Sequence, residues 1–540
     1  MSGAQDGLPV LVVGAGPVGL ALAGDLGWRG RQCLVVEQSD GSIYQPRMDL
    51  VGVRTMEFCR RWGLVDAVEH SPYPRDYPQD NVYLTSMTGW ELGRERMPAM
   101  GAEKSPPQSP QHRERCPQNM FDPILHQFAQ SFPTVTLRYR TRLVDFVEDG
   151  SGITATIEDL EHGKRATIRA AYLVGCDGAS SGVREKLGIA MLGNPALTYT
   201  TNIIFRCPNL VALHDKGKAY RHIFVGPEGT WGTIVAINGA DQWRMSIIGG
   251  AERKELSTAD IDAAIRRAVG RDFDYEILTV VPWTRRELVA EGYGKGRVFL
   301  AGDSVHVMSP TGGFGMNTGI QDAVDLSWKL DAALAGWGGP KLLDSYEVER
   351  RPVAVRNVAQ ATANLGRMRS PQRNDALLAD TPEGAKERAE VGRRFSEAMR
   401  HEWYTLGIHL GYRYDDSPIC WSDGTNPPPL EAMTYTQTAR PGARAPHVWL
   451  KDGRSTLDLF GRGFVLLRIG GGAPAGDALV HAAMQRGVPM TQLALDEPEV
   501  ARVYERRLVL VRPDGHVAWR DDALPADPLR LIDCVRGAPN

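Results

Sequence analysis

The 540-residue sequence lacks features that would point to several classes of protein. It has no basic excess, since 62 Lys and Arg stand against 65 Asp and Glu, so a broad nucleic-acid-binding surface is not expected. No apolar run reaches the roughly 20 residues that cross a bilayer, and the start "MSGAQDG" has no signal-peptide character. We therefore expect a cytoplasmic protein without nucleic-acid or membrane partners.

Cysteine is sparse, and its spacing excludes two further kinds of site. The seven cysteines, at positions 33, 59, 116, 176, 207, 420 and 534, include no C-x-x-C pair. Neither a zinc site nor a disulfide framework is therefore predicted. The twelve histidines show no paired spacing either, so we expect no metal site.

The N-terminal segment "LPVLVVGAGPVGLALAGDLGWRGRQCLVVEQ" has the pattern strand, glycine turn, helix, strand. Gly14, Gly16 and Gly19 satisfy G-x-G-x-x-G directly after an apolar strand, which favours a pyrophosphate at the start of the helix. Glu37 ends the second strand 18 residues after Gly19, where a carboxylate can bind ribose hydroxyls. The pattern predicts an ADP-containing dinucleotide and leaves NAD and FAD open; a glycine-rich packing turn is the structural alternative.

Two later segments decide between these cofactors. "ATIRAAYLVGCDGASSGVREKLGI" places Asp177 after an apolar strand, and "GKGRVFLAGDSVH" places Asp303 after another. With the glycine turn, and with "SYEVERRPVA" (345–354), they resemble the motifs of single-component FAD-dependent aromatic hydroxylases, which are flavoprotein monooxygenases. The resemblance implies an α/β fold, in which an antiparallel-sheet substrate domain is inserted into a Rossmann-type FAD-binding domain.

The resemblance also implies which residues contact FAD. Asp303 would bind the ribityl chain, "GGFGMN" would lie against the flavin ring, and Arg47 would meet the pyrophosphate. Gln118 would begin a helix that contacts FAD; for Arg47 and Gln118 a solvated surface position is the alternative. The full expected set is Gly14, Gly16, Pro17, Val18, Gly19, Glu37, Gln38, Arg47, Gln118, Asp177, Asp303, Pro310, Gly313, Gly315, Met316 and Asn317.

In this family, reduced FAD and dioxygen form a C4a-hydroperoxide that attacks an electron-rich ring. Asp49 in "DLVGVRTME" resembles an aspartate of the phenol hydroxylase branch that activates the phenol, although Leu50 and Val51 depart from that pattern. We expect Asp49 to be the general base; a cap of the next helix is the alternative. For His306 a structural role is favoured. No second glycine fingerprint occurs, and the resemblance implies that NADH or NADPH binds only transiently.

The middle segment 220–248 alternates apolar and polar residues and predicts antiparallel strands. By resemblance, this sheet covers the flavin ring, and the substrate would meet Asp49, Trp231, Trp283 and Pro310. For either tryptophan taken singly, core packing is the favoured role.

The C-terminal third predicts helices over 340–405 and a Pro- and Gly-rich linker over 416–450 that wraps the surface. Residues 451–540 resemble the thioredoxin-like domain of the phenol and polyketide hydroxylase branches, but Cys534 is alone there, which excludes thiol redox work. We expect this domain to serve packing or homodimer formation. The expected FAD-binding domain comprises 1–75, 112–185 and 285–400, and the substrate domain comprises 76–111 and 186–284.

The sequence therefore predicts an NAD(P)H-dependent FAD monooxygenase that hydroxylates a small phenolic or related aromatic compound with dioxygen. Two alternatives remain. One is an oxygenase of polycyclic polyketides, acting by hydroxylation or Baeyer–Villiger insertion, and the other is a non-enzymatic FAD-binding scaffold.

Overall fold

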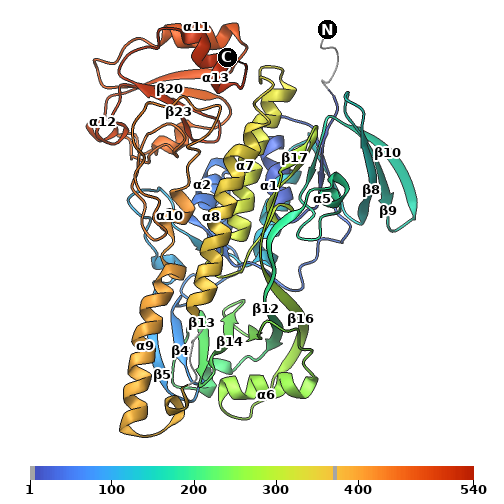
Figure 1. Ribbon diagram of the computed structural model, residues 1–540, viewed down its shortest axis with the longest axis vertical. Coiled ribbons are helices and arrows are strands. Elements are labelled where there is room, and N and C mark those ends of the chain that lie inside the picture. The colour runs from blue at the N-terminus through green and yellow to red at the C-terminus, as the bar shows by residue number, and fades with distance from the viewer. Residues whose placement is uncertain (1–6, 369–373, 540) are drawn as a thin grey trace.

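The computed structural model describes residues 7–368 and 374–539. Figure 1 shows three regions along the long axis: a C-terminal region at one end, a parallel sheet with long helices in the middle, and a second, antiparallel sheet at the other end. The long helices α7 (Gly315–Leu334) and α8 (Ser345–Met368) run through the middle.

The middle region is built on a six-stranded sheet. Its strand order is β17 (Gly294–Lys295), β18 (Val298–Leu300), β11 (Tyr172–Gly175), β1 (Val10–Val13), β2 (Cys33–Val36) and β7 (Val135–Arg138). All neighbours are parallel except β17 and β18. Strands β1, β2 and β11 are short, apolar and buried throughout, as expected of a parallel sheet covered on both faces.

Helices and a small sheet complete this region. Helix α1 (Pro17–Trp28) packs against α7 and against α4 (Gln118–Gln130), while α2 (Val53–Trp62) and α5 (Gly182–Leu187) follow other strands. The small antiparallel sheet comprises β8 (Thr141–Glu148), β9 (Ile153–Asp159) and β10 (Lys164–Ala170). An α/β fold is thereby confirmed.

The second region is an eight-stranded sheet that draws strands from distant parts of the chain. In order they are β19 (His306–Val307), β16 (Glu276–Ala290), β12 (Met191–Arg206), β15 (Gln242–Ile248), β14 (Gly229–Ala236), β13 (Arg221–Gly226), β4 (Asn81–Leu84) and β5 (Glu91–Glu95). Helix α6 (Thr258–Val269) packs on one face, and α9 (Pro382–Trp403) packs against β5. The long pair β12 and β16 carries the chain back to the six-stranded sheet.

The C-terminal region contains a four-stranded sheet in the order β21 (Met490–Leu495), β20 (Phe464–Ile469), β22 (Leu508–Val511) and β23 (Val517–Asp521). Its helices are α11 (Asp477–Gln485), α12 (Pro498–Tyr504) and α13 (Pro528–Val535). The remaining short elements are β3 (Leu50–Val51), α3 (Val65–Glu69), η1 (Met100–Ala102), β6 (Glu114–Arg115), η2 (Leu210–Leu213), η3 (Gly302–Ser304), η4 (Asp375–Leu378), α10 (Leu406–Leu410) and η5 (Thr456–Leu459).

The segment 416–450 is the surface linker that its composition predicts over only part of its length. Residues 441–448 are buried, and Arg444 is fully buried against Glu57 of α2. The Pro and Gly density does describe the irregular backbone, and residues 421–438 are exposed or partly exposed, as a surface linker requires; only residues 441–448 pass between the C-terminal sheet and the middle region. Over the described residues, no helix combines the length and apolar character that a membrane span requires.

Candidate functional site

The carboxyl ends of four parallel strands meet at one edge of the six-stranded sheet. The register aligns Val13 with Val36 and Gly175, and Gly175 with Leu300. The segments that follow these strands carry the glycine turn, Glu37, Asp177 and Asp303. The structure therefore brings these sequence-predicted residues to the edge where open α/β sheets bind ligands.

The glycine turn is packed on one side and open on the other. A Cβ atom on Gly14 would lie 2.4 Å from the carbonyl oxygen of Cys176, and one on Gly19 would lie 2.0 Å from that of Gly14. A Cβ on Gly16 would meet nothing within 4 Å, so the backbone at the start of α1 can approach a pyrophosphate closely. The Ala15 N–H donates to Glu37 Oε2 at 2.9 Å, which joins the turn to the second strand.

Asp303 is accessible to solvent, yet burial raises its pKa, although His306 and Arg47 lower it. An accessible carboxyl that is still desolvated lies in a recess with protein around it. Asp322 of α7 holds the segment 302–306 in place. Its Oδ2 accepts a hydrogen bond from the Gly302 N–H at 3.1 Å and lies 2.8 Å from His306 Nε2. His306 is fully buried, so the structure supports its structural role.

Arg47 lies near Asp303, since its charge lowers the pKa of that carboxyl. Its guanidinium is exposed and lies 5.7 Å from the ring centre of Trp283 on β16. Its backbone N–H donates to Gln118 Oε1 at 3.0 Å, while Gln118 Nε2 donates to Asp122 at 3.1 Å. Gln118 therefore positions the segment that carries Arg47. Both ends of the Gln118 side-chain amide take part in hydrogen bonds within the protein.

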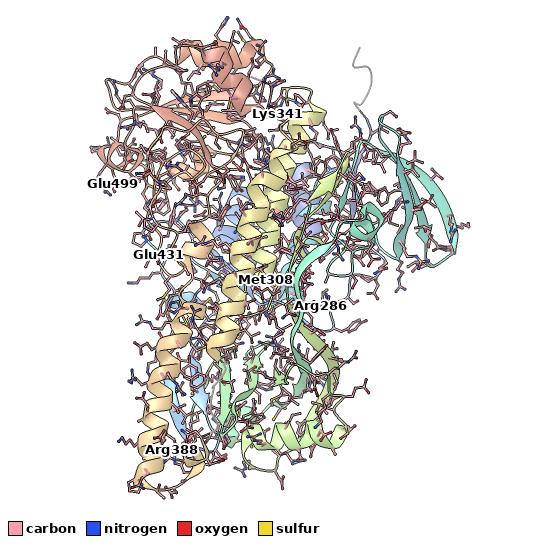
Figure 2. The ribbon with its side chains drawn as sticks, in the orientation of Figure 1. Arg286, Met308, Lys341, Arg388, Glu431 and Glu499 are labelled. Carbon is pink, nitrogen blue, oxygen red and sulfur yellow. The ribbon has the colours of Figure 1, made fainter. Side chains whose placement is uncertain are left out.

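The start of α7 holds the segment that follows Asp49 in place. The buried Asn317 side chain makes four hydrogen bonds: Oδ1 accepts from the Gly52 N–H and Thr55, and Nδ2 donates to Leu50 and Gly313 carbonyls. Gly315 begins the helix, Met316 is half-buried, and Pro310 is exposed. Figure 2 labels Met308, which directly follows β19, and Arg286 of β16, the strand that pairs with β19.

Other expected cofactor residues have mainly local contacts. Asp177 accepts hydrogen bonds from the Ser181 hydroxyl at 2.5 Å and the Val183 N–H at 3.1 Å, and so begins α5. Val18 fills the space in front of Gly302, where a Cβ atom would lie 2.9 Å from its methyl group. Pro17 begins α1, and Gln38 is exposed after the second strand.

Asp49 lies between the two sheets and binds groups from both sides. Its Oδ1 accepts from Arg115 at 2.7 Å, its Oδ2 accepts from the Tyr220 hydroxyl at 2.5 Å, and Arg244 lies 3.5 Å away. Burial raises the pKa of Asp49, but Arg115, Arg244 and the Tyr220 hydrogen bond together hold it below its ordinary value. Asp49 is therefore a firmly ionised carboxylate, and its side chain is about one-fifth exposed, at 19%.

The two tryptophans of the expected substrate pocket lie in different places. Trp283 faces Arg47, whereas Trp231 belongs to the hydrophobic core against α6, 5.5 Å from the Phe224 ring and 4.1 Å from the Arg267 guanidinium. The structure does not bring Trp231 to the group around Asp49, because alternate residues of β14 point to opposite faces of the sheet. We therefore correct its expected place from the pocket to the core.

Several residues of this site carry no motif signal. Tyr220, Arg115 and Arg244 come from three separate segments, and only strand pairing brings them to Asp49. Asp322 and Arg350, which are joined at 2.8 Å, also have no local signature beyond the helical pattern. Arg350 does fall within "SYEVERRPVA", which the resemblance had already singled out.

The residues at this edge fit an FAD molecule. The open backbone at Gly16 and the exposed Arg47 suit a pyrophosphate, and the recessed carboxyl of Asp303 has no hydrogen-bonding partner among the described residues. Polar groups that are left without partners in a recess favour a polar ligand there.

Comparisons with known proteins agree with this geometry. The family described as "FAD binding domain" matches residues 7–361, and "Aromatic-ring hydroxylase, C-terminal" matches residues 438–536. A putative polyketide hydroxylase of Streptomyces halstedii is 36% identical, over 96% of this chain and 94% of its own length. A 4-methyl-5-nitrocatechol 5-monooxygenase of Burkholderia sp. is 33% identical, over 98% of this chain and 97% of its own.

A solved structure is similar over almost its whole length. The rebeccamycin biosynthetic enzyme RebC with reduced flavin is 40% identical and has a TM-score of 0.92. The match covers 98% of this chain and 99% of that one.

Proposed function

The chain belongs to the FAD-dependent aromatic-ring hydroxylases, and we propose that it is an NAD(P)H-dependent monooxygenase that inserts one oxygen atom into a hydroxylated aromatic ring. The group around Asp49 carries this proposal. It joins a carboxylate of the FAD-binding part to Tyr220 and Arg244 at the second sheet, beside the expected flavin position.

FAD, when bound and reduced, supplies the activated dioxygen of this family's chemistry. The protein would hold it through the glycine turn and Glu37 at one end and through Asp303 and Arg47 further along. The start of α7 adds its positive end, which favours negative charge on a reduced ring. These residues bind and orient the cofactor and exclude water from it.

The ring hydroxyl of the substrate would donate a hydrogen bond to Asp49. Since Arg115 and Arg244 keep Asp49 ionised, complete proton transfer to this carboxylate is unfavourable. We therefore assign Asp49 the role of hydrogen-bond acceptor and anchor, instead of the free general base expected from the resemblance. The Arg244 guanidinium would then stabilise negative charge that develops on the ring oxygen.

Burial raises the pKa of Tyr220, so its hydroxyl stays protonated and donates to Asp49. Arg115 lies over the Tyr220 ring at 3.7 Å and fixes it in place. Tyr220 would thus orient the carboxylate toward the ring hydroxyl of the substrate.

A polycyclic aromatic substrate is the second candidate. The similarity to a putative polyketide hydroxylase, at 36% identity, supports this second candidate. The similarity to a 4-methyl-5-nitrocatechol 5-monooxygenase, at 33% identity, supports a single-ring substrate. Ring size in the active compound separates the two candidates.

The first experiment measures NADH and NADPH oxidation by the purified flavoprotein with phenols, naphthols and larger hydroxylated polycycles, with product masses recorded. A compound that speeds oxidation and gains one oxygen atom supports the proposal. Absence of any product with an added oxygen, across rings of every size, would contradict it.

Variants of Asp49 and Tyr220 test the assigned roles. Asp49→Asn and Tyr220→Phe should keep FAD and lower the hydroxylation rate about tenfold to a hundredfold, since each removes a charge-assisted hydrogen bond. Because Asp49 is ionised from pH 5 upward, the wild-type profile should show no acid limb from this carboxyl. The Asp49→Asn loss should shrink at a pH above the phenol pKa; a loss that is independent of pH would remove ring-hydroxyl activation from its role.

The C-terminal region supports a thioredoxin-like fold. The unit β20–α11–β21 has parallel strands, and the antiparallel pair β22 and β23 and then α13 follow it. We propose that this region serves packing, and homodimer formation is tested by light scattering of the purified protein.

A further inference from the structure

A cavity lies where α2 meets the C-terminal region, and we call it the α2 cavity. Its volume is about 260 Å³. Its walls come from the end of α1, from α2, from η5 and the residues after it, and from the turn between β22 and β23. The lining residues that matter here are Trp28, Phe58, Arg61, Leu457, Phe460 and Gly515.

Arg61 is the unusual residue of this cavity. Its guanidinium has no hydrogen bond or ion pair to any described residue, and its Nη1 atom is fully buried. Its one ring contact is with Phe58, at 5.6 Å. Burial lowers the pKa of Arg61 to about 10, although Asp25 raises it. An arginine that is desolvated without a partner is costly unless an anion compensates it.

The other charged groups of the cavity already have partners. Arg60 binds Asp458 through two hydrogen bonds of 2.7 and 2.9 Å. Arg54 binds Glu57 at 2.7 Å and the Asp514 carbonyl at 3.0 Å, and Arg444 also binds Glu57. The positive charge of Arg61 is therefore the one left over among these groups.

The remaining walls are apolar and aromatic. Trp28, Phe58 and Phe460 provide ring surfaces, and Leu457 adds an aliphatic side. Gly515, at φ +87°, has no side chain, and a Cβ there would lie 3.4 Å from Arg61 Nη2. Ring surfaces beside one unpaired guanidinium match a flat apolar molecule with a single carboxylate.

We propose that the α2 cavity is a binding site for a small aromatic carboxylate, separate from the flavin site. The carboxylate pairs with Arg61, and the ring lies between Phe58, Trp28 and Phe460. Helix α2 connects the site to the segment that carries Asp49. This helix begins directly after Gly52, whose N–H is held by Asn317, and ends at the cavity.

Calorimetric titration of the FAD-loaded protein with 1-naphthoate tests the proposal. The wild type should bind, and Arg61→Gln should weaken binding roughly tenfold to a hundredfold, as expected for a charge-assisted bond. The neutral 1-naphthamide should bind the wild type as weakly as naphthoate binds the variant. Flavin content and NAD(P)H oxidation of Arg61→Gln should equal those of the wild type.

Two further variants separate the cavity from a general charge effect. Arg60→Gln removes a neighbouring, paired cation and should change naphthoate affinity less than about fivefold. Leu457→Trp keeps Arg61 but fills the cavity from the C-terminal side, and should abolish binding. Unchanged naphthoate affinity in Arg61→Gln, equal binding of acid and amide, or no binding to the wild type would each overturn the proposal.

Discussion

Charge is arranged in opposite ways at the two ends of α7. At its start, the Asp303 carboxyl and the Arg47 guanidinium are both accessible, and neither has a hydrogen-bonded partner among the described residues. Further along, the side chains of Lys329, Asp325 and Glu349 are at most 1% exposed, and Lys329 binds both carboxylates. Arg512, which directly follows β22 in the C-terminal region, belongs to the same group. Its Nη1 atom lies 2.6 Å from Glu349 Oε1.

This contrast separates a binding site from a structural connection. A buried group whose charges are all paired holds its elements in one arrangement, whereas an unpartnered charge in a recess can contribute energy to a ligand. The paired group joins α7 and α8 to the C-terminal region. The position of the start of α7, and with it the proposed flavin site, therefore depends on contacts at the other end of the helix.

The largest expected effect comes from breaking the paired group. Glu349→Gln removes the charge that Lys329 and Arg512 share, and should destabilise the protein by about 3–5 kcal/mol, as breaking a buried ion pair does. The midpoint of urea unfolding, followed by tryptophan fluorescence, measures this loss. A midpoint close to that of the wild type would mean that the group is no structural connection.

The second prediction concerns the pH dependence of the stability that the buried Glu57 contributes. Burial raises the pKa of Glu57, but Arg444 and Arg54 lower it to about 2 in the folded protein, against about 4.3 when unfolded. The folded value is depressed, so this stability is present above pH 4.3 and is lost as the pH falls toward 2. The contribution at neutral pH is about 3 kcal/mol.

Unfolding experiments at pH 7, 5 and 3.5 measure the contribution of Glu57. The wild type should lose stability mainly below pH 4.5, and Glu57→Gln should show a shallower fall over the same range. Parallel pH curves for the two proteins would assign the acid sensitivity to other carboxyls.

The substitution Asp303→Ala tests the proposed flavin site at the start of α7. The variant should bind FAD about tenfold to a hundredfold more weakly, because a charge-assisted hydrogen bond is lost. It should be purified with little yellow colour, while its circular dichroism stays that of a folded protein. FAD content per chain, read from the visible spectrum, measures the effect, and full occupancy would remove Asp303 from the flavin site.

The two ends of α7 also differ in how far the sequence predicts them. Glu37 directly follows a short apolar strand and Asp303 comes three residues after another, so their placement at the sheet edge depends on local pattern alone. Glu349 and Arg512 are 163 residues apart and Arg444 is 387 residues from Glu57, so only the folded chain brings them together. For the same reason, composition predicted a surface linker where residues 441–448 are buried.

Tyr220 and Trp231 show the same limit within one short segment. Both lie in the stretch that alternation predicts as antiparallel strands, yet Tyr220 reaches Asp49 and Trp231 enters the core against α6. Alternation predicts that neighbouring residues face opposite sides of a sheet. It does not tell which side faces the flavin, because that depends on how the second sheet packs.

An exposed ion pair gives the smallest expected effect and sets the scale for the others. Arg393 binds Glu390 and Glu397 on the outer face of α9, where all three side chains are more than half exposed. Water screens these charges and the side chains lose freedom on pairing, so Arg393→Gln should leave the urea midpoint within experimental error. A shift as large as that of Glu349→Gln would show that pairing alone stabilises this chain, whatever the burial. Equal midpoints for Arg393→Gln and the wild type, beside a large loss in Glu349→Gln, would assign the stabilisation to the buried group that holds α7.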